Sequence, residues 1–170
     1  WVNITMKAPG GTAVRLNPSD PAQAGMWSRI IPNQPAEIVK NGGGMVTLTG
    51  NNTYDGGTYV NEGTLVAASN SAADGSSGPL GEESTGTTVA DGGTLAFTGG
   101  VTVTEDVTLA GSGAPGRGGV LANISGDNTY SGTITHDNDA LIIGSADGEL
   151  TINQPIDLQL ARLEVGGAGN

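Results

Sequence analysis

The stretch Gly44–Val66 reads GMVTLTGNNTYDGGTYVNEGTLV, and the fold is decided there. Apolar and small polar residues alternate in its first and last runs, Val46–Thr49 and Thr64–Val66, which is the pattern of short β-strands. Glycine and asparagine lie between these runs, and both tolerate the positive φ of tight corners. The phrase returns later, because Gly126–Gly132 (GDNTYSG) restates Gly50–Gly56 (GNNTYDG). Such recurrence predicts a stacked repeat architecture.

The same stretch resembles the autotransporter-associated β-strand repeat, whose consensus runs close to GxLTLTGNNTYxGGTxVNxGTL. The similarity extends more loosely to Gly78–Gly81, Asp91–Leu95 and Ile142–Gly144, and it leaves out residues 1–40. The resemblance implies an all-β chain folded as a right-handed parallel β-helix, in a large bacterial surface or secreted protein. The family has no motif for catalysis, so the resemblance implies no functional residues.

Residues 42–170 are expected to form this solenoid, with about six coils of roughly 20 residues each. The threonines between the apolar positions are expected to face solvent. Two glycine-rich stretches without alternation, Ser69–Gly78 and Gly111–Gly119, are interpreted as loops. The expected inward residues are Val46, Leu48, Val60, Leu65, Ala67, Val89, Leu95, Phe97, Val101, Val103, Val107, Leu109, Val120, Ala122, Ile124, Ile134, Ile142, Leu150, Ile152, Ile156, Leu158, Leu163 and Val165.

Residues 1–41 have a different composition from the coil region. They hold five of the eight prolines and both tryptophans, Trp1 and Trp27. Trp1–Met6 alternates as a strand does, whereas proline is excluded from a central ladder. This non-repeat segment is interpreted as a cap over the bare strand edges of the first coil, as a linker, or as an assembly arm. In the arm interpretation, the apolar stretch Met26–Ile31 packs on another subunit or domain.

Composition limits the kinds of partner. Of 170 residues, 30 are glycine, 14% are charged and 4% are aromatic, which suits coils that each bury few side chains. A net charge of −11 with only six Lys and Arg argues against nucleic acid and against anionic lipid. The lack of cysteine removes disulfides and thiolate sites. No apolar run is long enough for membrane insertion as a helix, and the start at Trp1 is interpreted as a processed or excised chain.

His136 and the three residues after it form one candidate site. Asp137, Asn138 and Asp139 carry the oxygen ligands that calcium prefers. Their spacing matches neither the twelve-residue EF-hand loop nor a serial GGxGxD nonapeptide, and no nucleophile accompanies His136 as a catalytic arrangement requires. A solvated turn is therefore expected at this position, without a metal ion or cofactor.

Two adjacent carboxylate pairs, Glu82–Glu83 and Glu105–Asp106, are candidates for acid–base catalysis. Neighbouring strand residues point to opposite faces, so neither pair is expected to act as a couple. Lys40, Arg117 and Arg162 are dispersed along the coil region and do not suggest the basic cluster of a lyase-type site. The sequence therefore predicts no catalytic residue and no enzyme.

Polar residues of the repeat phrase are better explained by structure than by binding. Asparagine side chains can hydrogen-bond along a stack of strands, and Tyr54 and Tyr130 occupy equivalent corners. Stacking in the fold is favoured for the two tyrosines, with contact to a glycan as the alternative. The asparagines interpreted in this way are Asn51, Asn52, Asn61, Asn123 and Asn128.

The two ends of the coil region resemble one another, since Gly167–Asn170 is similar to Gly42–Met45. Another strand is due after the last coil, and an uncovered edge is a template for further strands. The predicted function is structural: a secreted or cell-surface β-helix that stacks head to tail in an extracellular filament or forms a rigid rod. The alternative is a passenger fragment of a large bacterial autotransporter or adhesin that presents a binding region.

Overall fold

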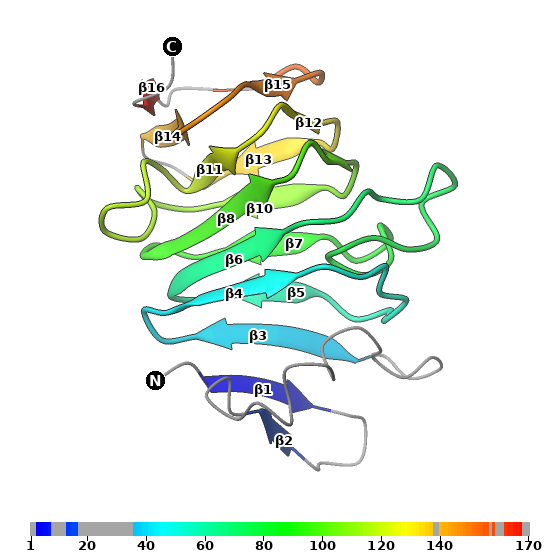
Figure 1. Ribbon diagram of the computed structural model, residues 1–170. Coiled ribbons are helices and arrows are strands. Elements are labelled where there is room, and N and C mark those ends of the chain that lie inside the picture. Colours follow the sequence, from blue (N-terminus) through cyan, green and yellow to red (C-terminus); the bar gives the residue numbers. More distant parts are fainter. Residues whose placement is uncertain are drawn as a thin grey trace.

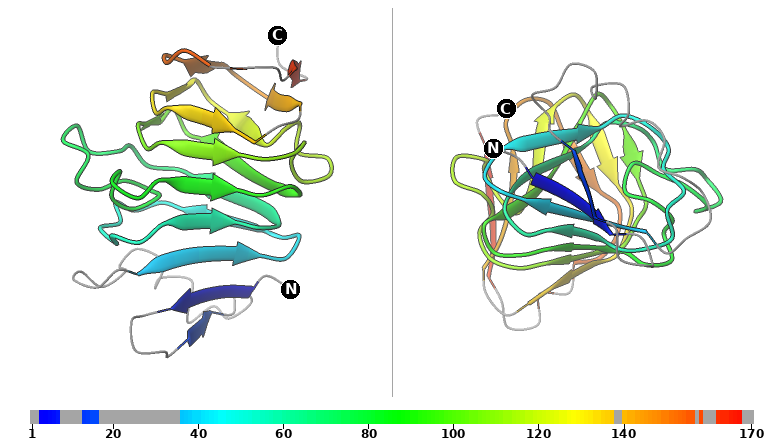
Figure 2. Two further views of the ribbon diagram at one scale, coloured as in Figure 1. Left: turned by 180° about the vertical axis from the view of Figure 1, so that it is seen from behind. Right: turned by 90° about the horizontal axis from the view of Figure 1, so that it is seen from below.

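The computed structural model describes residues 3–7, 13–16, 36–137, 140–156, 158 and 162–167. This part of the chain contains sixteen strands and no helix. The strands lie in three sheets around one main core (Figure 1, Figure 2). Successive turns of the chain contribute strands to the first two sheets, and some later turns also contribute a strand to the third. The chain is therefore all-β and forms a parallel β-helix, as the repeat phrase predicts.

The first sheet has seven strands and the second has six. In spatial order the first contains β13 (Ile134–His136), β10 (Val107–Leu109), β7 (Thr87–Val89), β5 (Thr58–Val60), β3 (Glu37–Asn41), β1 (Asn3–Lys7) and β2 (Ala13–Leu16). The second contains β16 (Leu163–Gly167), β14 (Leu141–Ser145), β11 (Leu121–Ser125), β8 (Gly93–Thr98), β6 (Gly63–Ala67) and β4 (Met45–Leu48). The third contains β15 (Leu150–Ile152), β12 (Asn128–Tyr130) and β9 (Thr102–Val103).

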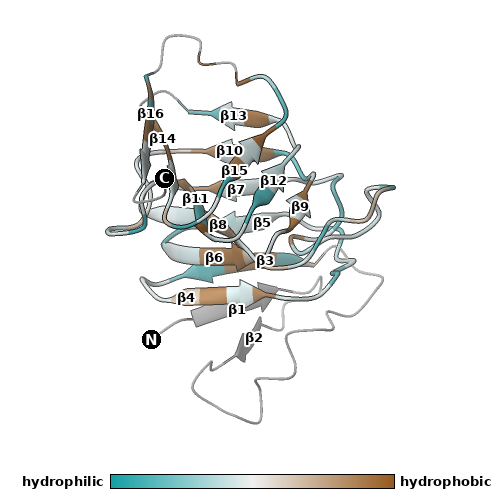
Figure 3. Cartoon of the chain, turned by 45° about the horizontal axis from the view of Figure 1, so that its top comes forward, coloured by the Kyte–Doolittle hydropathy of each residue, from teal (hydrophilic) through white to brown (hydrophobic). Residues whose placement is uncertain are grey.

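All strand pairs from β3 onward are parallel, and they hold the coils in register. One row of inward side chains runs through the whole second sheet, and we call it the apolar column. It consists of Val46, Leu65, Leu95, Leu121, Ile143 and Val165. Figure 3 shows the apolar residues of these strands in brown. The six parallel strands of the second sheet agree with the expected number of coils.

Most expected inward residues lie in the core. The buried ones are Val46, Leu48, Val60, Leu65, Ala67, Val89, Leu95, Phe97, Val101, Val103, Val107, Leu109, Val120 and Ile134. Five others are partly buried and pack against this core: Leu150, Ile152, Ile156, Leu158 and Leu163. The two stretches expected as loops, Ser69–Gly78 and Gly111–Gly119, contain no strand. Alternation therefore located the core of the regular coils correctly.

The alternation failed at two places in the later coils. Val120 and Leu121 are both buried in the core, so the register shifts by one and places Ala122 and Ile124 in a separate outer cluster with Val66 and Ala96. In β14 the residues that point inward are Leu141 and Ile143, and Ile142 is only half-buried. Val165 keeps its place in the apolar column yet is 75% exposed, because no described coil covers it.

The expectation that the threonines face solvent is wrong for four of them. Thr47, Thr88 and Thr108 are exposed as expected. The four buried exceptions are Thr58, Thr64, Thr87 and Thr94. Hydrogen bonds explain most of this burial, since a buried hydroxyl is tolerated when it has a partner: the Thr58 hydroxyl donates to the Leu80 carbonyl at 2.9 Å, and that of Thr94 donates to the Gly119 carbonyl at 2.8 Å.

The first coil begins with β3, which pairs in parallel with β5 ahead of the repeat phrase at Gly44. On its other side β3 pairs antiparallel with β1, and β2 pairs antiparallel with β1. Strand β1 is the alternating segment noted near the N-terminus. The remaining features of the N-terminal segment, Trp1, Trp27 and the stretch Met26–Ile31, lie outside the described residues.

Candidate functional site

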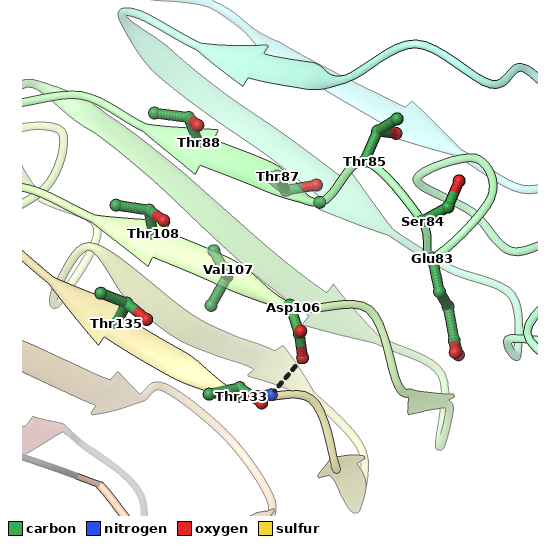
Figure 4. A pocket seen from close by; sticks show the side chains of 11 residues that line it. Glu83, Ser84, Thr85, Thr87, Thr88, Asp106, Val107, Thr108, Thr133 and Thr135 are labelled. Atoms are coloured by element: carbon green, nitrogen blue, oxygen red, sulfur yellow. Dashed lines mark hydrogen bonds between the residues drawn. The ribbon is translucent and has the colours of Figure 1, made fainter.

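A shallow polar cavity of about 310 Å³ lies on the outer surface of the first sheet (Figure 4). Its walls come from three successive coils and carry many hydroxyl groups. Thr88, Thr108 and Thr135 are in register on β7, β10 and β13, and all three are exposed. The lining residues are Glu83, Ser84, Thr85, Gly86, Thr87, Thr88, Asp106, Val107, Thr108, Thr133 and Thr135.

Two carboxylates from different coils lie in this cavity. Asp106 accepts a 2.7 Å hydrogen bond from the Thr133 backbone N–H of the next coil. Glu83 accepts a hydrogen bond from the Thr104 hydroxyl, which lies two residues before Asp106 in the sequence. Sequence reasoning considered only adjacent carboxylates and missed this convergence, because it depends on how the coils are registered.

Glu105 points away from the cavity and into the core. It is 2% exposed, whereas Asp106 beside it is exposed, so the expected opposite orientation of this pair is confirmed. The Thr87 hydroxyl donates a 2.7 Å hydrogen bond to Glu105 Oε1. Burial raises the pKa of Glu105 to about 8, opposed by the Thr87 hydrogen bond and reinforced by the nearby charges of Glu83 and Asp106.

The two repeat tyrosines are core residues. Tyr54 is 1% exposed and Tyr130 is fully buried, so neither ring presents a surface to a glycan and the structural interpretation holds. The Tyr54 hydroxyl lies 2.5 Å from the Thr58 hydroxyl, and the Tyr130 hydroxyl donates to the Glu105 carbonyl. Tyr130 also packs against Phe97, with ring centroids 5.6 Å apart. Burial raises the pKa of both tyrosines above the ordinary value.

The asparagines divide into corner residues and surface residues. Asn52, Asn123 and Asn128 are buried, and their side-chain amides bond to backbone carbonyls at the corners. Asn128 Oδ1 also accepts the Val101 N–H of the preceding coil at 2.8 Å, and its amide donates to Asn123. Two others, Asn51 and Asn61, are exposed, and Asn61 donates to the Asn41 side chain at 2.9 Å.

His136 is the last residue of β13 and pairs with Leu109, so it is part of a strand and not of a solvated turn. Its Nε2 lies 3.1 Å from the Leu158 carbonyl, while its Nδ1 is buried without a hydrogen-bond partner. Asp137 follows the strand and is exposed; Asn138 and Asp139 lie outside the described residues. Within the described ranges, no group of three or more His, Cys, Asp or Glu side chains has a geometry that could hold a metal ion.

The three basic residues of the coil region have separate environments. Lys40 is fully buried, and its Nζ donates to the carbonyls of Gly42 at 2.5 Å and Glu62 at 2.7 Å. Burial lowers the pKa of Lys40, and the Glu62 charge opposes this. Arg162 forms an exposed 2.5 Å ion pair with Glu164, and neither arginine lines the cavity. No helix of the described part of the chain could span a bilayer.

Removing the Tyr130 hydroxyl tests its structural role. Tyr130→Phe leaves the buried Glu105 carbonyl without this donor, so we expect the free energy of unfolding to fall by about 1–3 kcal/mol. Urea unfolding of both proteins measures the difference. Tyr59→Phe is the matched control, since Tyr59 is 38% exposed and we expect it to change stability by less than about 0.5 kcal/mol. Equal effects of the two variants would contradict the assignment.

Comparison with known proteins now identifies the coil phrases. The passenger-associated-transport-repeat model matches residues 38–67 and 120–135. These two segments are similar to passenger-associated-transport repeats. A 74-residue part of the chain, 44% of it, is 39% identical to the Adhesin BmaC autotransporter of Brucella suis biovar 1 (strain 1330). The chain spans 2% of the length of that relative. No solved structure matches the chain.

The repeat phrase has a direct structural meaning at the corners. In the first repeat, a Cβ on Gly56 would lie 2.4 Å from the Ala36 carbonyl oxygen of the preceding coil. In the second repeat, a Cβ on Gly132 would lie 2.0 Å from the Glu105 carbonyl oxygen. Both distances are too short for any side chain, so glycine is required where one coil passes over the previous one. The repeat therefore encodes coil stacking.

Proposed function

We propose that the chain is a rigid, non-catalytic rod segment of a longer passenger protein that is secreted or displayed on a bacterial cell surface. One observation carries this proposal: the apolar column runs through every coil of the second sheet and ends at Val165, which is 75% exposed. An inward residue left in water marks a place for further burial. The passenger-associated-transport repeats and the similarity to an autotransporter adhesin support the surface location.

We further propose that the uncovered face takes one more coil of the same protein and not a second copy of this segment. The reason lies at the opposite face, where β1 and β2 already occupy the first sheet in the antiparallel direction. In the first sheet, a second copy stacked head to tail would meet that antiparallel hairpin instead of a parallel coil edge. A following coil of the chain has no such obstacle.

Duplicating one coil tests the rod proposal. Leu121 pairs with Ile143 and Ile143 with Val165, so the last two coils have the same length in the second sheet. Inserting a second copy of residues 121–142 after residue 142 keeps every later residue in register. We expect a cooperative fold that is longer by one strand spacing, about 4.8 Å, for each copy inserted.

Small-angle scattering on variants with one, two and three inserted copies measures this increment. As a control, each inserted copy of residues 121–142 is shortened by one residue. The apolar residues then lie on the wrong face, and these variants are expected to unfold. An unfolded or aggregated in-register series would contradict the rod proposal. A mass that rises with protein concentration would instead favour end-to-end association of separate copies.

A further inference from the structure

The three residues of the corner Thr104–Asp106 each form a side-chain hydrogen bond to a neighbouring coil. The Thr104 hydroxyl donates to Glu83, Glu105 Oε1 accepts from Thr87, and Asp106 accepts from the Thr133 N–H. The main chain continues the pattern, since the Thr87 N–H donates to the Asp106 carbonyl at 2.9 Å. This corner therefore holds the coil before it and the coil after it together.

The corner also gathers negative charge around a buried carboxyl group. Glu105 is 2% exposed, and the charged groups that act on it are Glu83, from the loop before β7, and Asp106, which directly precedes β10. The Tyr130 hydroxyl of β12 donates to the Glu105 backbone carbonyl, and the Glu105 charge contributes to the raised pKa of both Tyr130 and Tyr54. Within the described part of the chain, both charged groups that act on Glu105 are therefore negative.

We infer that the Thr104–Asp106 corner is a pH-sensitive joint, tight while Glu105 is protonated and looser once it ionises. An ionised Glu105 would be a buried charge beside two other carboxylates, with one hydroxyl donor, and such a charge is costly. The inference does not depend on the proposed rod function, because it concerns the cohesion of neighbouring coils whatever they serve.

The direction in which stability changes with pH follows from the pKa of Glu105 in the folded and in the unfolded chain. Glu105 has an ordinary pKa of 4.5 and a folded-state pKa raised to about 8, so between these values the folded state keeps a proton that the unfolded state releases. Folding stability therefore falls as the pH rises through this window. One retained proton makes the equilibrium constant for unfolding rise about tenfold per pH unit. Below pH 4.5 this group has no effect, and above about pH 8 the loss levels off.

Glu105→Gln is the test, because glutamine has the same shape, still accepts the Thr87 hydrogen bond and never ionises. Urea unfolding from pH 5 to pH 9 is expected to show a fall in wild-type stability that the variant lacks. Asp55→Asn is the matched control; Asp55 is an exposed carboxylate in an earlier coil, so the fall is expected to persist. Parallel pH profiles for wild type and Glu105→Gln would overturn the inference.

Hydrogen exchange locates the change. At pH 9 compared with pH 6, protection factors of the Thr87 and Val107 amides are expected to drop in the wild type and not in Glu105→Gln. The Asn61 amide, which donates to the Lys40 carbonyl at 2.9 Å, is the distant reference. Should the variant fail to fold, carbon NMR of the wild-type glutamate carboxyls decides the question. A midpoint near 8 for Glu105 supports the joint, and a midpoint below 6 overturns it.

Discussion

Replacing Gly63 with alanine is expected to lower the free energy of unfolding by about 3 kcal/mol or more, because a left-handed backbone and a backbone clash combine. Gly63 has a φ of +74° at the start of β6. A Cβ there would lie 2.4 Å from the Gly42 carbonyl oxygen, 2.5 Å from that of Gly44 and 2.7 Å from Lys40 Nζ. None of these atoms can move without disturbing the corner between β3 and β4.

Gly92→Ala is the matched control for this prediction. Gly92 has a φ of +86°, yet a Cβ at this position would have no atom within 4 Å. Only the left-handed conformation is then unfavourable, at about 1–2 kcal/mol. Urea unfolding of the two variants separates the conformational cost from the steric cost. Equal losses would show that the close approach of coils at Gly63 contributes nothing.

The second large effect is expected in the apolar column. Leu95 is fully buried between Leu65 and Leu121, so Leu95→Ala should cost about 2–5 kcal/mol of stability. Val165 belongs to the same column but is 75% exposed, so Val165→Ala should change stability by less than about 0.5 kcal/mol. Thermal and urea unfolding of both variants measure this contrast.

The same pair of variants also tests the proposed continuation of the rod. In a longer chain whose next coil covers Val165, Val165→Ala should become costly, by about 1–3 kcal/mol, as burial of a valine side chain implies. The effect of Leu95→Ala should stay the same in both chains. If Val165→Ala remains neutral in the longer chain, the next coil does not rest on the apolar column.

The regular part of the fold could be predicted because each coil is specified by a short sequence pattern of alternating residues and glycine corners. Val46 and Leu65 lie in alternating runs beside glycine corners, and these runs became strands of one sheet with the expected residues inside. The prediction of inward residues failed where two consecutive apolar residues are both buried, as at Val120 and Leu121. Both are buried because the strand begins at Leu121, and alternation carries no information on where a strand begins.

The cavity and the buried carboxyl group could not be predicted in this way. Glu83 lies in the irregular loop before β7 and Asp106 lies just before β10, so their place in one cavity depends on the length of that loop. Glu105 looks like any polar corner residue in the sequence, and only the fold shows that its side chain enters the core. The buried tyrosines were located at equivalent corners, but their depth was not evident from a phrase rich in polar residues.

The two faces of the stack differ, and this has a mechanical consequence. A parallel coil contacts only its neighbours, so a pulling force applied to the chain ends acts on the outermost coils first. In the described part of the chain, β3 pairs with β1 and β5 on its two sides, whereas β16 pairs with β14 alone. Under load the segment should therefore yield from the β16 side, coil by coil. Each released coil of about 20 residues adds roughly 70 Å of extended chain, so the rod lengthens in steps and does not break at once.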